Sequence, residues 1–176
     1  RSISEVFVAT THLEEDLQIV KLCASIGVRV FVGSKTDVLD RYYQVAKLIK
    51  PQHIVRITAD CPVIDPHVID MVVEEHISSR SDYTSNTLGI PFPDGQDVEV
   101  FTYESLKDAW DNANLKSERE HVTPYIKYGK GDAKVNYIQS TKELSRKRWT
   151  LDEIEDFELI KLFYDELYSE DRLFGM

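Results

Sequence analysis

Two aspartates stand where an α/β protein is expected to do chemistry, because each directly follows a predicted strand. Asp60 follows the apolar stretch 53–59, and Asp152 follows the stretch 147–151. Open α/β sheets bind their ligands beyond the carboxyl ends of the strands. If these two strands lie near each other, the two carboxylates converge, and two carboxylates with phosphate oxygens and waters suit Mg²⁺. The spacing therefore predicts a magnesium site in which Asp60 and Asp152 are the metal ligands and the catalytic residues.

Each aspartate also has a purely structural interpretation. An aspartate at a strand end commonly forms a turn or caps the next helix. After Asp60, Pro62 and the pair Asp65-Pro66 already supply the turn and the cap, which favours the metal role there. Asp152 directly precedes a predicted helix, so a capping role stays open for it.

The sequence lacks the other common catalytic motifs. It contains no glycine-rich dinucleotide fingerprint, no P-loop, no Gly-x-Ser-x-Gly elbow and no His or Cys spacing suited to zinc. Among the five histidines His121 stands apart, because the stretch 118–124 gathers acidic, basic and imidazole side chains next to Pro124.

The elements that must position these residues alternate through the first half of the chain. Short β-branched or apolar runs predict strands, and helical spacing of apolar residues predicts helices between them. The predicted strands are 5–10, 28–32 and 53–59, and the predicted helices are 14–26, 37–50 and one that begins at 65. This alternation is typical of crossover units on a parallel sheet.

The second half is predicted to be less regular. The expected strands are 82–85, 97–101, 134–139 and 147–151, and the expected helices are 102–113, 117–128 with a break at Pro124, and 154–168. Acidic and apolar residues alternate at 97–101, which predicts a half-exposed strand. Glycine and proline punctuate the stretch 86–96, which predicts a loop. Without a repeat or a linker, residues 1–176 are expected to form a single domain.

Net charge indicates which partners are unfavourable, and cysteine content indicates the redox compartment. A formal net charge of -10 argues against duplex nucleic acid and anionic membranes as partners. The two cysteines, Cys23 and Cys61, suggest no disulfide framework, which fits a reducing, cytoplasmic compartment. The sequence shows neither a membrane-spanning apolar run nor a signal peptide.

Five stretches, in order, resemble the cytidylyltransferase family, in its branch of spore coat polysaccharide biosynthesis protein F-like enzymes. They are residues 37–43, 55–66, 93–101, 118–125 and 148–157. The resemblance implies a Rossmann-like nucleotide-diphosphosugar transferase fold, with a mostly parallel central sheet flanked by helices. It implies a reaction of CTP with a sugar or sugar acid that yields a CMP-sugar and pyrophosphate for surface or spore coat polysaccharide. A homodimer is common in the wider family and is expected here.

The resemblance also implies roles for single residues. Relatives hold Mg²⁺ with the aspartates in the positions of Asp60 and Asp152. Arg56 shares strand parity with Asp60, so it is expected to reach the nucleotide, although a surface arginine on a strand edge is the alternative. Arg41 is expected to bind the nucleotide too, or else to pair with Asp37 on its own helix.

The resemblance further implies that polar side chains from two parts of the chain surround the acceptor sugar. Amide, carboxylate and imidazole groups are suitable partners for sugar hydroxyls. The residues in question are Asn86, Asp97, Glu99, Glu120 and His121.

One part of the family pattern has no counterpart in the sequence. Relatives begin with a strand and a glycine-containing loop whose Arg and Lys wrap the triphosphate, so this chain is expected to be N-terminally truncated. The basic cluster of Lys142, Arg146, Lys147 and Arg148 is predicted to be a solvated face rather than a substitute. Without the loop, weak CTP binding and little turnover are expected.

Two other functions are weighed against the enzyme. The first is a non-catalytic remnant that keeps the sugar-side surface and serves as a binding or assembly module. The second is a glycosyltransferase of related fold. It ranks last, because Asp60-Cys61-Pro62 lacks the second carboxylate of the Asp-x-Asp pattern that such enzymes usually show.

Overall fold

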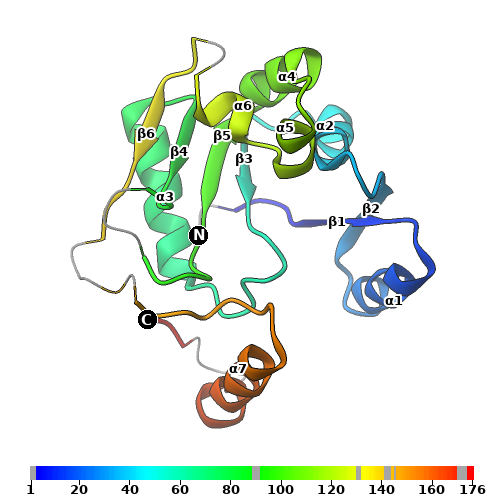
Figure 1. Cartoon of the computed structure of the whole chain (residues 1–176), viewed down its shortest axis with the longest axis vertical. Helices are drawn as coiled ribbons and strands as arrows, with labels where there is room; N and C mark the ends of the chain where they lie inside the picture. Colours follow the sequence, from blue (N-terminus) through cyan, green and yellow to red (C-terminus); the bar gives the residue numbers. More distant parts are fainter. Residues whose placement is uncertain (1–2, 89–91, 130–131, 141–143, 145, 170–173) are drawn as a thin grey trace. The chain divides into compact units, whose positions relative to one another are not determined.

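The structure is a computed structural model of the chain that describes residues 3–88, 92–129, 132–140, 144, 146–169 and 174–176 (Figure 1). Its contacts divide the chain into two compact units, and each is described by itself. Unit 1 comprises Arg1–Ile54 and Phe101–Val135, and unit 2 comprises Val55–Val100 and Asn136–Met176.

Unit 1 begins with the predicted strand–helix–strand crossover. β1 (Phe7–Thr11) pairs in parallel with β2 (Arg29–Gly33), with Phe7 opposite Arg29. The connection is the 3₁₀ turn η1 (Glu14–Asp16) followed by α1 (Leu17–Ser25), and Figure 1 shows α1 beside the two strands. Parallel strands need such a crossover, so the predicted unit is confirmed at this point.

Helix α2 (Val38–Ile49) is the centre of unit 1. It starts at Asp37, whose side chain accepts a hydrogen bond from the Asp40 backbone N–H at 2.9 Å, as an N-cap does. The helix contacts α4 (Tyr103–Asn112) and α5 (Lys116–His121). The ring of Tyr43 stacks on that of Trp110 with centroids 4.2 Å apart. The N-cap Asp37 fixes the start of α2, and the buried side chains of Leu39 and Tyr43 pack the first turns of the helix into the unit.

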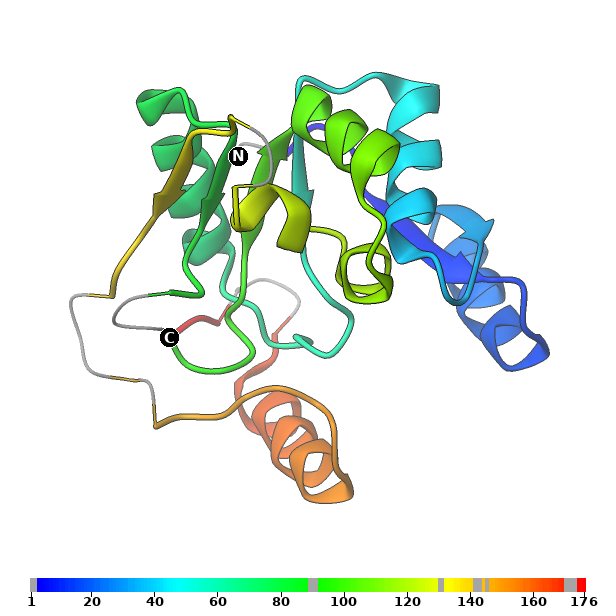
Figure 2. The same ribbon diagram turned by 45° about the horizontal axis from the view of Figure 1, so that its top comes forward.

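A four-stranded sheet has the order β3-β5-β4-β6, and the unit boundaries fall inside three of its strands. The strands are β3 (His53–Arg56), β5 (Glu99–Thr102), β4 (Tyr83–Ser85) and β6 (Val135–Tyr137). Helix α3 (Pro66–Ser79) contacts β4 and lies behind it in both views (Figures 1 and 2). The core of unit 2 lies among Val68, Val72, Val73, Phe92, Val98 and Val100.

Two further helices complete the description. The predicted break at Pro124 is confirmed, because α5 ends at His121 and α6 (Pro124–Lys127) starts with the proline in its first turn. In unit 2, α7 (Ile154–Leu167) corresponds to the predicted closing helix. None of the helices within the described ranges combines the length and apolar composition needed to cross a bilayer.

Two predicted strands at the candidate site were wrong in extent. β3 ends at Arg56 instead of continuing to residue 59, because the chain then enters turns in which Cys61 N–H bonds the Thr58 carbonyl oxygen at 3.2 Å. The predicted strand 147–151 is reduced to a single bridge between Arg148 and Asp94. Asp60 and Asp152 therefore both lie in irregular segments.

The prediction of a half-exposed strand at 97–101 was also wrong. Val98, Val100 and Phe101 are 0% exposed, and Glu99 is 6% exposed. β5 lies between β3 and β4 in the sheet, and the side chain of Glu99 on this strand is 8% exposed. The alternating pattern failed because Glu99 has buried polar partners.

Candidate active site

A backbone hydrogen bond makes the two predicted metal ligands neighbours within unit 2. Leu151 N–H donates to the carbonyl oxygen of Asp60 at 2.8 Å, and Asp152 is the next residue. The Asp152 side chain is 51% exposed, and Asp60 is half-buried. The two carboxylates thus start from adjacent backbone positions, although neither residue ends a strand. Their metal-binding role stays a prediction.

The turn that carries Asp60 is held by its neighbour Cys61. Cys61 is 5% exposed, and its thiol lies 3.6 Å from Asp60 Oδ1. Burial raises the pKa of the Cys61 thiol to about 11, the Thr58 hydroxyl acts in the opposite direction, and the Asp60 and Asp97 carboxylates add to the rise. At neutral pH the thiol therefore stays protonated, so Cys61 serves as a packing group rather than a nucleophile.

A buried amide network links Asn86 to the segments 63–65 and 96–98; residues 89–91 of the predicted loop lie outside the described residues. Asn86 and Gln96 are each 1% exposed. Asn86 Nδ2 donates to the Gln96 carbonyl oxygen at 2.7 Å, and Asn86 Oδ1 accepts from Val98 N–H at 2.8 Å. Gln96 Oε1 accepts from Asp65 N–H at 2.8 Å, and Gln96 Nε2 donates to the Val63 carbonyl oxygen at 2.9 Å. Asn86 therefore holds the backbone at Gln96 and Val98, and its expected contact with the acceptor stays a prediction.

Asp94 and Gly95 are joined to the segment that precedes Asp152. Asp94 N–H donates to the Lys147 carbonyl oxygen at 3.1 Å, and Trp149 N–H donates to the Asp94 carbonyl oxygen at 2.7 Å. Gly95 has φ +94°, and a Cβ added there would lie 2.5 Å from the Trp149 carbonyl carbon. Glycine is therefore required here for both its backbone conformation and its size. We call residues 58–65, 86, 94–98 and 147–152 the aspartate platform.

Replacing Gly95 with alanine is expected to loosen the aspartate platform. The added Cβ both strains a left-handed backbone and overlaps the Trp149 backbone, so we expect a loss of about 2–4 kcal/mol in the free energy of unfolding. Urea denaturation measures this loss. Gly27→Ala is the matched control, because Gly27 has φ +72° but nothing within 4 Å of an added Cβ. Equal losses in the two variants would contradict the close approach at Gly95.

Arg56, Glu99 and Tyr83 form a buried polar cluster in unit 2. Arg56 Nη1 forms an ion pair with Glu99 Oε2, and the Tyr83 hydroxyl donates to Glu99 Oε1 at 2.6 Å. The two charged side chains are 17% and 8% exposed. Burial, followed by the Glu99 charge, raises the pKa of Tyr83 well above its usual value. The alternative of Arg56 as a surface arginine is therefore wrong, while its nucleotide contact and the sugar contact of Glu99 stay predictions.

Arg41 lies in unit 1, near the carboxyl ends of β1 and β2. Its stem packs on Gly33, where an added Cβ would meet Arg41 Cγ at 2.7 Å. The pKa of Asp16 is lowered chiefly by the Thr11 hydroxyl, with a smaller contribution from the Arg41 charge. Strand carboxyl ends are where ligands bind in such folds, so the nucleotide role of Arg41 stays a reasonable prediction.

The alternative of an Arg41–Asp37 pair is wrong, because Arg119 engages the Asp37 carboxylate. Arg119 Nη2 lies 2.6 Å from Asp37 Oδ2, and Arg119 Nε lies 3.1 Å from Oδ1. Arg119 Nη1 also donates to the Trp110 carbonyl oxygen at 2.9 Å. One arginine thus ties α2, α4 and α5 of unit 1 together.

Glu120 and His121 are both exposed at the end of α5, next to a strained turn. Val122 has φ 71° and ψ −56°, and Thr123 N–H donates to the His121 carbonyl oxygen at 2.8 Å. These values describe a γ-turn of the rarer, strained hand, which is unusual for a β-branched residue. Val122 is 0% exposed, so packing holds the turn and with it the direction of the backbone beyond His121. The sugar contacts of both residues stay predictions.

Arg148 is the residue that the sequence interpretation missed. Its guanidinium contacts the carboxylates of Asp94 at 3.1 Å, Asp152 at 2.7 Å and Asp156 at 2.8 Å. It is therefore an ion-paired residue of the aspartate platform and not simply a member of a solvated basic face; Lys142 of that cluster lies outside the described residues. The four-residue spacing from Arg148 to Asp152 was a visible signal, but Asp94 comes from a distant segment.

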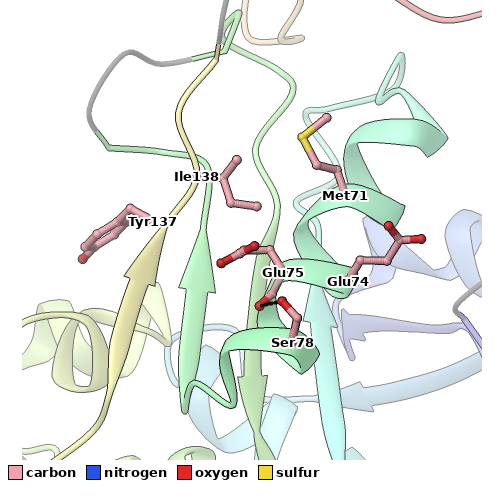
Figure 3. Close-up of a pocket in the computed structure, with 6 residues that line it drawn as sticks. All are labelled: Met71, Glu74, Glu75, Ser78, Tyr137 and Ile138. Carbon is pink, nitrogen blue, oxygen red and sulfur yellow. Dashed lines mark hydrogen bonds between the residues drawn. The ribbon is translucent and has the colours of Figure 1, made fainter.

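A cavity of about 580 Å³ lies between α3 and β6 in unit 2 (Figure 3). The residues that line it are Met71, Glu74, Glu75, Ser78, Tyr137 and Ile138. Two of them are acidic and none is basic, so the cavity does not suit a triphosphate. None of the predicted site residues lines it.

The donor set around Asp60 and Asp152 fits Mg²⁺ in an open coordination. Within the described ranges, no three His, Cys, Asp or Glu side chains gather as they do when protein alone holds a metal. Magnesium commonly keeps several waters and takes one or two carboxylates plus substrate phosphates. Asp60 and Asp152 could supply one carboxylate each to such a site, because their backbones are adjacent and the Asp152 side chain is 51% exposed.

Comparisons with known proteins identify the family to which the chain belongs. The cytidylyltransferase family model matches residues 1–171. An uncharacterised protein of Methanocaldococcus jannaschii is 44% identical over 161 residues, which are 90% of this chain and 65% of that protein. The spore coat polysaccharide biosynthesis protein SpsF of Bacillus subtilis is 34% identical over 162 residues, 90% of this chain and 66% of that protein. The chain thus spans less than two thirds of the length of both relatives.

Solved structures agree with the predicted fold class. A cytidylyltransferase from Leptospira borgpetersenii matches with a TM-score of 0.88 at 32% identity, covering 96% of this chain and 71% of that one. A CMP:2-keto-3-deoxy-manno-octonic acid synthetase complexed with CTP matches with a TM-score of 0.59 at 12% identity, covering 94% and 83%, which supports the fold alone. From its first residue to residue 171, this chain belongs to the cytidylyltransferase family.

Proposed function

We propose that the chain carries the catalytic centre of a CTP-dependent nucleotidyltransferase that activates a sugar or sugar acid. The product is a CMP-sugar, and pyrophosphate is released. The observation that carries the proposal is the Leu151–Asp60 hydrogen bond of 2.8 Å, which makes Asp60 and Asp152 neighbours. The membership of the family supports the nucleotide, and the name of the SpsF relative supports a role in polysaccharide synthesis.

In the proposed reaction the protein must position two substrates, CTP and the acceptor sugar. The acceptor hydroxyl oxygen forms a bond to the α-phosphorus of CTP, the bond from that phosphorus to the pyrophosphate oxygen breaks, and the acceptor proton is lost. Asp60 and Asp152 would hold Mg²⁺, which supplies charge neutralisation on the phosphates when it is bound. The Thr150 hydroxyl, 3.5 Å from Asp152 Oδ2, helps to orient that carboxylate.

The remaining expected contacts divide between the two units. In unit 2, Asp97 lies next to Cys61, and its carboxylate is our candidate for an acceptor hydroxyl. In unit 1, the exposed Glu120 and His121 are candidates for sugar hydroxyls, and Arg41 is a candidate for the nucleotide. We place the reaction in the cytoplasm, in keeping with the free thiols of Cys23 and Cys61.

Calorimetry and a pyrophosphate-release assay test the proposal. We expect CTP to bind more tightly with Mg²⁺ than without it, and a member of a panel of sugars and sugar acids to release pyrophosphate. The Leptospira cytidylyltransferase is the reference for both measurements. CTP binding that is indifferent to Mg²⁺ would count against the metal site, whereas metal-dependent binding without turnover would favour the non-catalytic binding module.

A further inference from the structure

One guanidinium serves three carboxylates at the edge of the aspartate platform. Arg148 Nη1 contacts Asp94 Oδ2 at 3.1 Å, and Arg148 Nη2 contacts both Asp152 Oδ2 at 2.7 Å and Asp156 Oδ2 at 2.8 Å. The cluster therefore holds more negative than positive charge among these four side chains. Asp152 is also one of the two candidate metal ligands. The guanidinium of Arg148 and a divalent metal ion could therefore both bind the same carboxylate.

The three carboxylates are held with very different strength. Asp156 is 15% exposed and accepts from Arg148 Nε at 3.3 Å, from Arg148 Nη2, and from the backbone N–H groups of Asp152 and Glu153, both at 3.0 Å. Asp156 is therefore the fixed anchor of the guanidinium.

Asp152 is the loosely held member of the cluster. Its side chain is 51% exposed. Among the described residues, its carboxylate pairs with Arg148 and accepts a long hydrogen bond of 3.5 Å from the Thr150 hydroxyl. Exposed ion pairs between side chains are weak and easily exchanged. Asp152 can leave Arg148 while Asp156 and Asp94 keep the guanidinium in place.

We propose that Arg148 is the counter-ion of Asp152 in the metal-free protein and competes with the divalent cation for this carboxylate. The inference rests on the proposed metal site of Asp60 and Asp152. A cation that takes Asp152 Oδ2 displaces the guanidinium from that oxygen, and one that takes Oδ1 lies close to the positive charge of Arg148. Either effect weakens binding of the metal alone. In return, the cluster is never left with three uncompensated carboxylates when the metal is absent.

A titration with Mn²⁺, followed by the paramagnetic signal of the free ion, tests the competition without any assay of activity. We expect Arg148→Gln to bind Mn²⁺ about two- to five-fold more tightly than the control Arg146→Gln. Arg146 is exposed and lies two residues earlier, so its variant removes the same charge from the same segment. Equal or weaker Mn²⁺ binding by Arg148→Gln relative to this control would overturn the inference.

Two further variants separate the inference from the proposed function. If Asp152→Asn binds Mn²⁺ as the wild type does, the metal assignment itself fails. If Asp152→Asn binds more weakly and Arg148→Gln matches its control, only the competition fails. If Arg148→Gln does not fold, Arg148→Lys is the substitute variant. The lysine ammonium keeps the charge but makes fewer hydrogen bonds to the carboxylates than the planar guanidinium does. We then expect tighter Mn²⁺ binding than in the wild type, and unchanged binding would overturn the inference.

Discussion

Replacing Asp60 with asparagine is expected to lower kcat/KM for CMP transfer by about 10²–10³-fold, as the loss of an electrostatic group that acts on the transition state does. Asparagine keeps the size of the side chain and the backbone carbonyl that accepts from Leu151 at 2.8 Å. It removes the negative charge that the metal needs. Steady-state kinetics measure the loss, and a thermal unfolding curve close to that of the wild type shows that the fold is intact.

The metal dependence of the same variant makes the test specific. We expect Asp60→Asn to need a higher Mg²⁺ concentration for half-maximal rate, whereas Asp165→Asn is expected to behave as the wild type. Asp165 is an exposed residue of α7 in unit 2 that pairs with Lys161 at 3.4 Å. A normal rate and a normal Mg²⁺ dependence in Asp60→Asn would refute the role of this residue as a metal ligand.

Replacing Glu99 with glutamine is expected to lower the free energy of unfolding by about 3 kcal/mol. The ion pair of Glu99 with Arg56 is buried, and removing one partner of a buried pair leaves the other charge poorly compensated. Glutamine keeps a carbonyl that can accept from the Tyr83 hydroxyl, so the variant isolates the charge. Urea denaturation gives the free energy.

Two comparisons control the Glu99 result. Glu5→Gln breaks the exposed ion pair between Glu5 and Arg29, in which the Glu5 side chain is 47% exposed and the Arg29 side chain 63% exposed. This variant is expected to change the free energy of unfolding by less than about 1 kcal/mol. The double variant Arg56→Met/Glu99→Gln is expected to recover much of the loss, because neither charge remains and glutamine still accepts from the Tyr83 hydroxyl. Equal effects of Glu99→Gln and Glu5→Gln would argue that the buried pair contributes no more than an exposed one.

Much of the local structure of both units could be predicted from the sequence. The crossover from β1 through α1 to β2 follows from short apolar runs that flank a helical pattern. The starts of three helices follow from their capping residues, because Asp37, Asp65 and Thr102 each accept a hydrogen bond from a backbone N–H two or three residues ahead. Such interactions involve neighbours in the chain, so the sequence pattern alone reveals them.

The errors fall where partners come from distant segments. Asp97 to Phe101 looked half-exposed because Glu99 is acidic, but Arg56, 43 residues away, provides the charge that allows its burial. The stretch before Asp152 looked like a strand, but its backbone groups reach Asp94 and Asp60 at single points instead of forming a ladder. Periodicity reports which residues are apolar and does not report which polar groups find a partner.

The sequence by itself determined that Asp60 and Asp152 are carboxylates directly after two segments predicted as strands, in an α/β chain of the cytidylyltransferase family. Only the tertiary structure decided that Leu151 bonds Asp60, that Gly95 packs on Trp149, and that Arg148 takes hold of Asp152. The physical reason is the range of the interactions. Helix caps and apolar periodicity act over a few residues, whereas the aspartate platform is made by hydrogen bonds and ion pairs that exist only after distant segments have packed together.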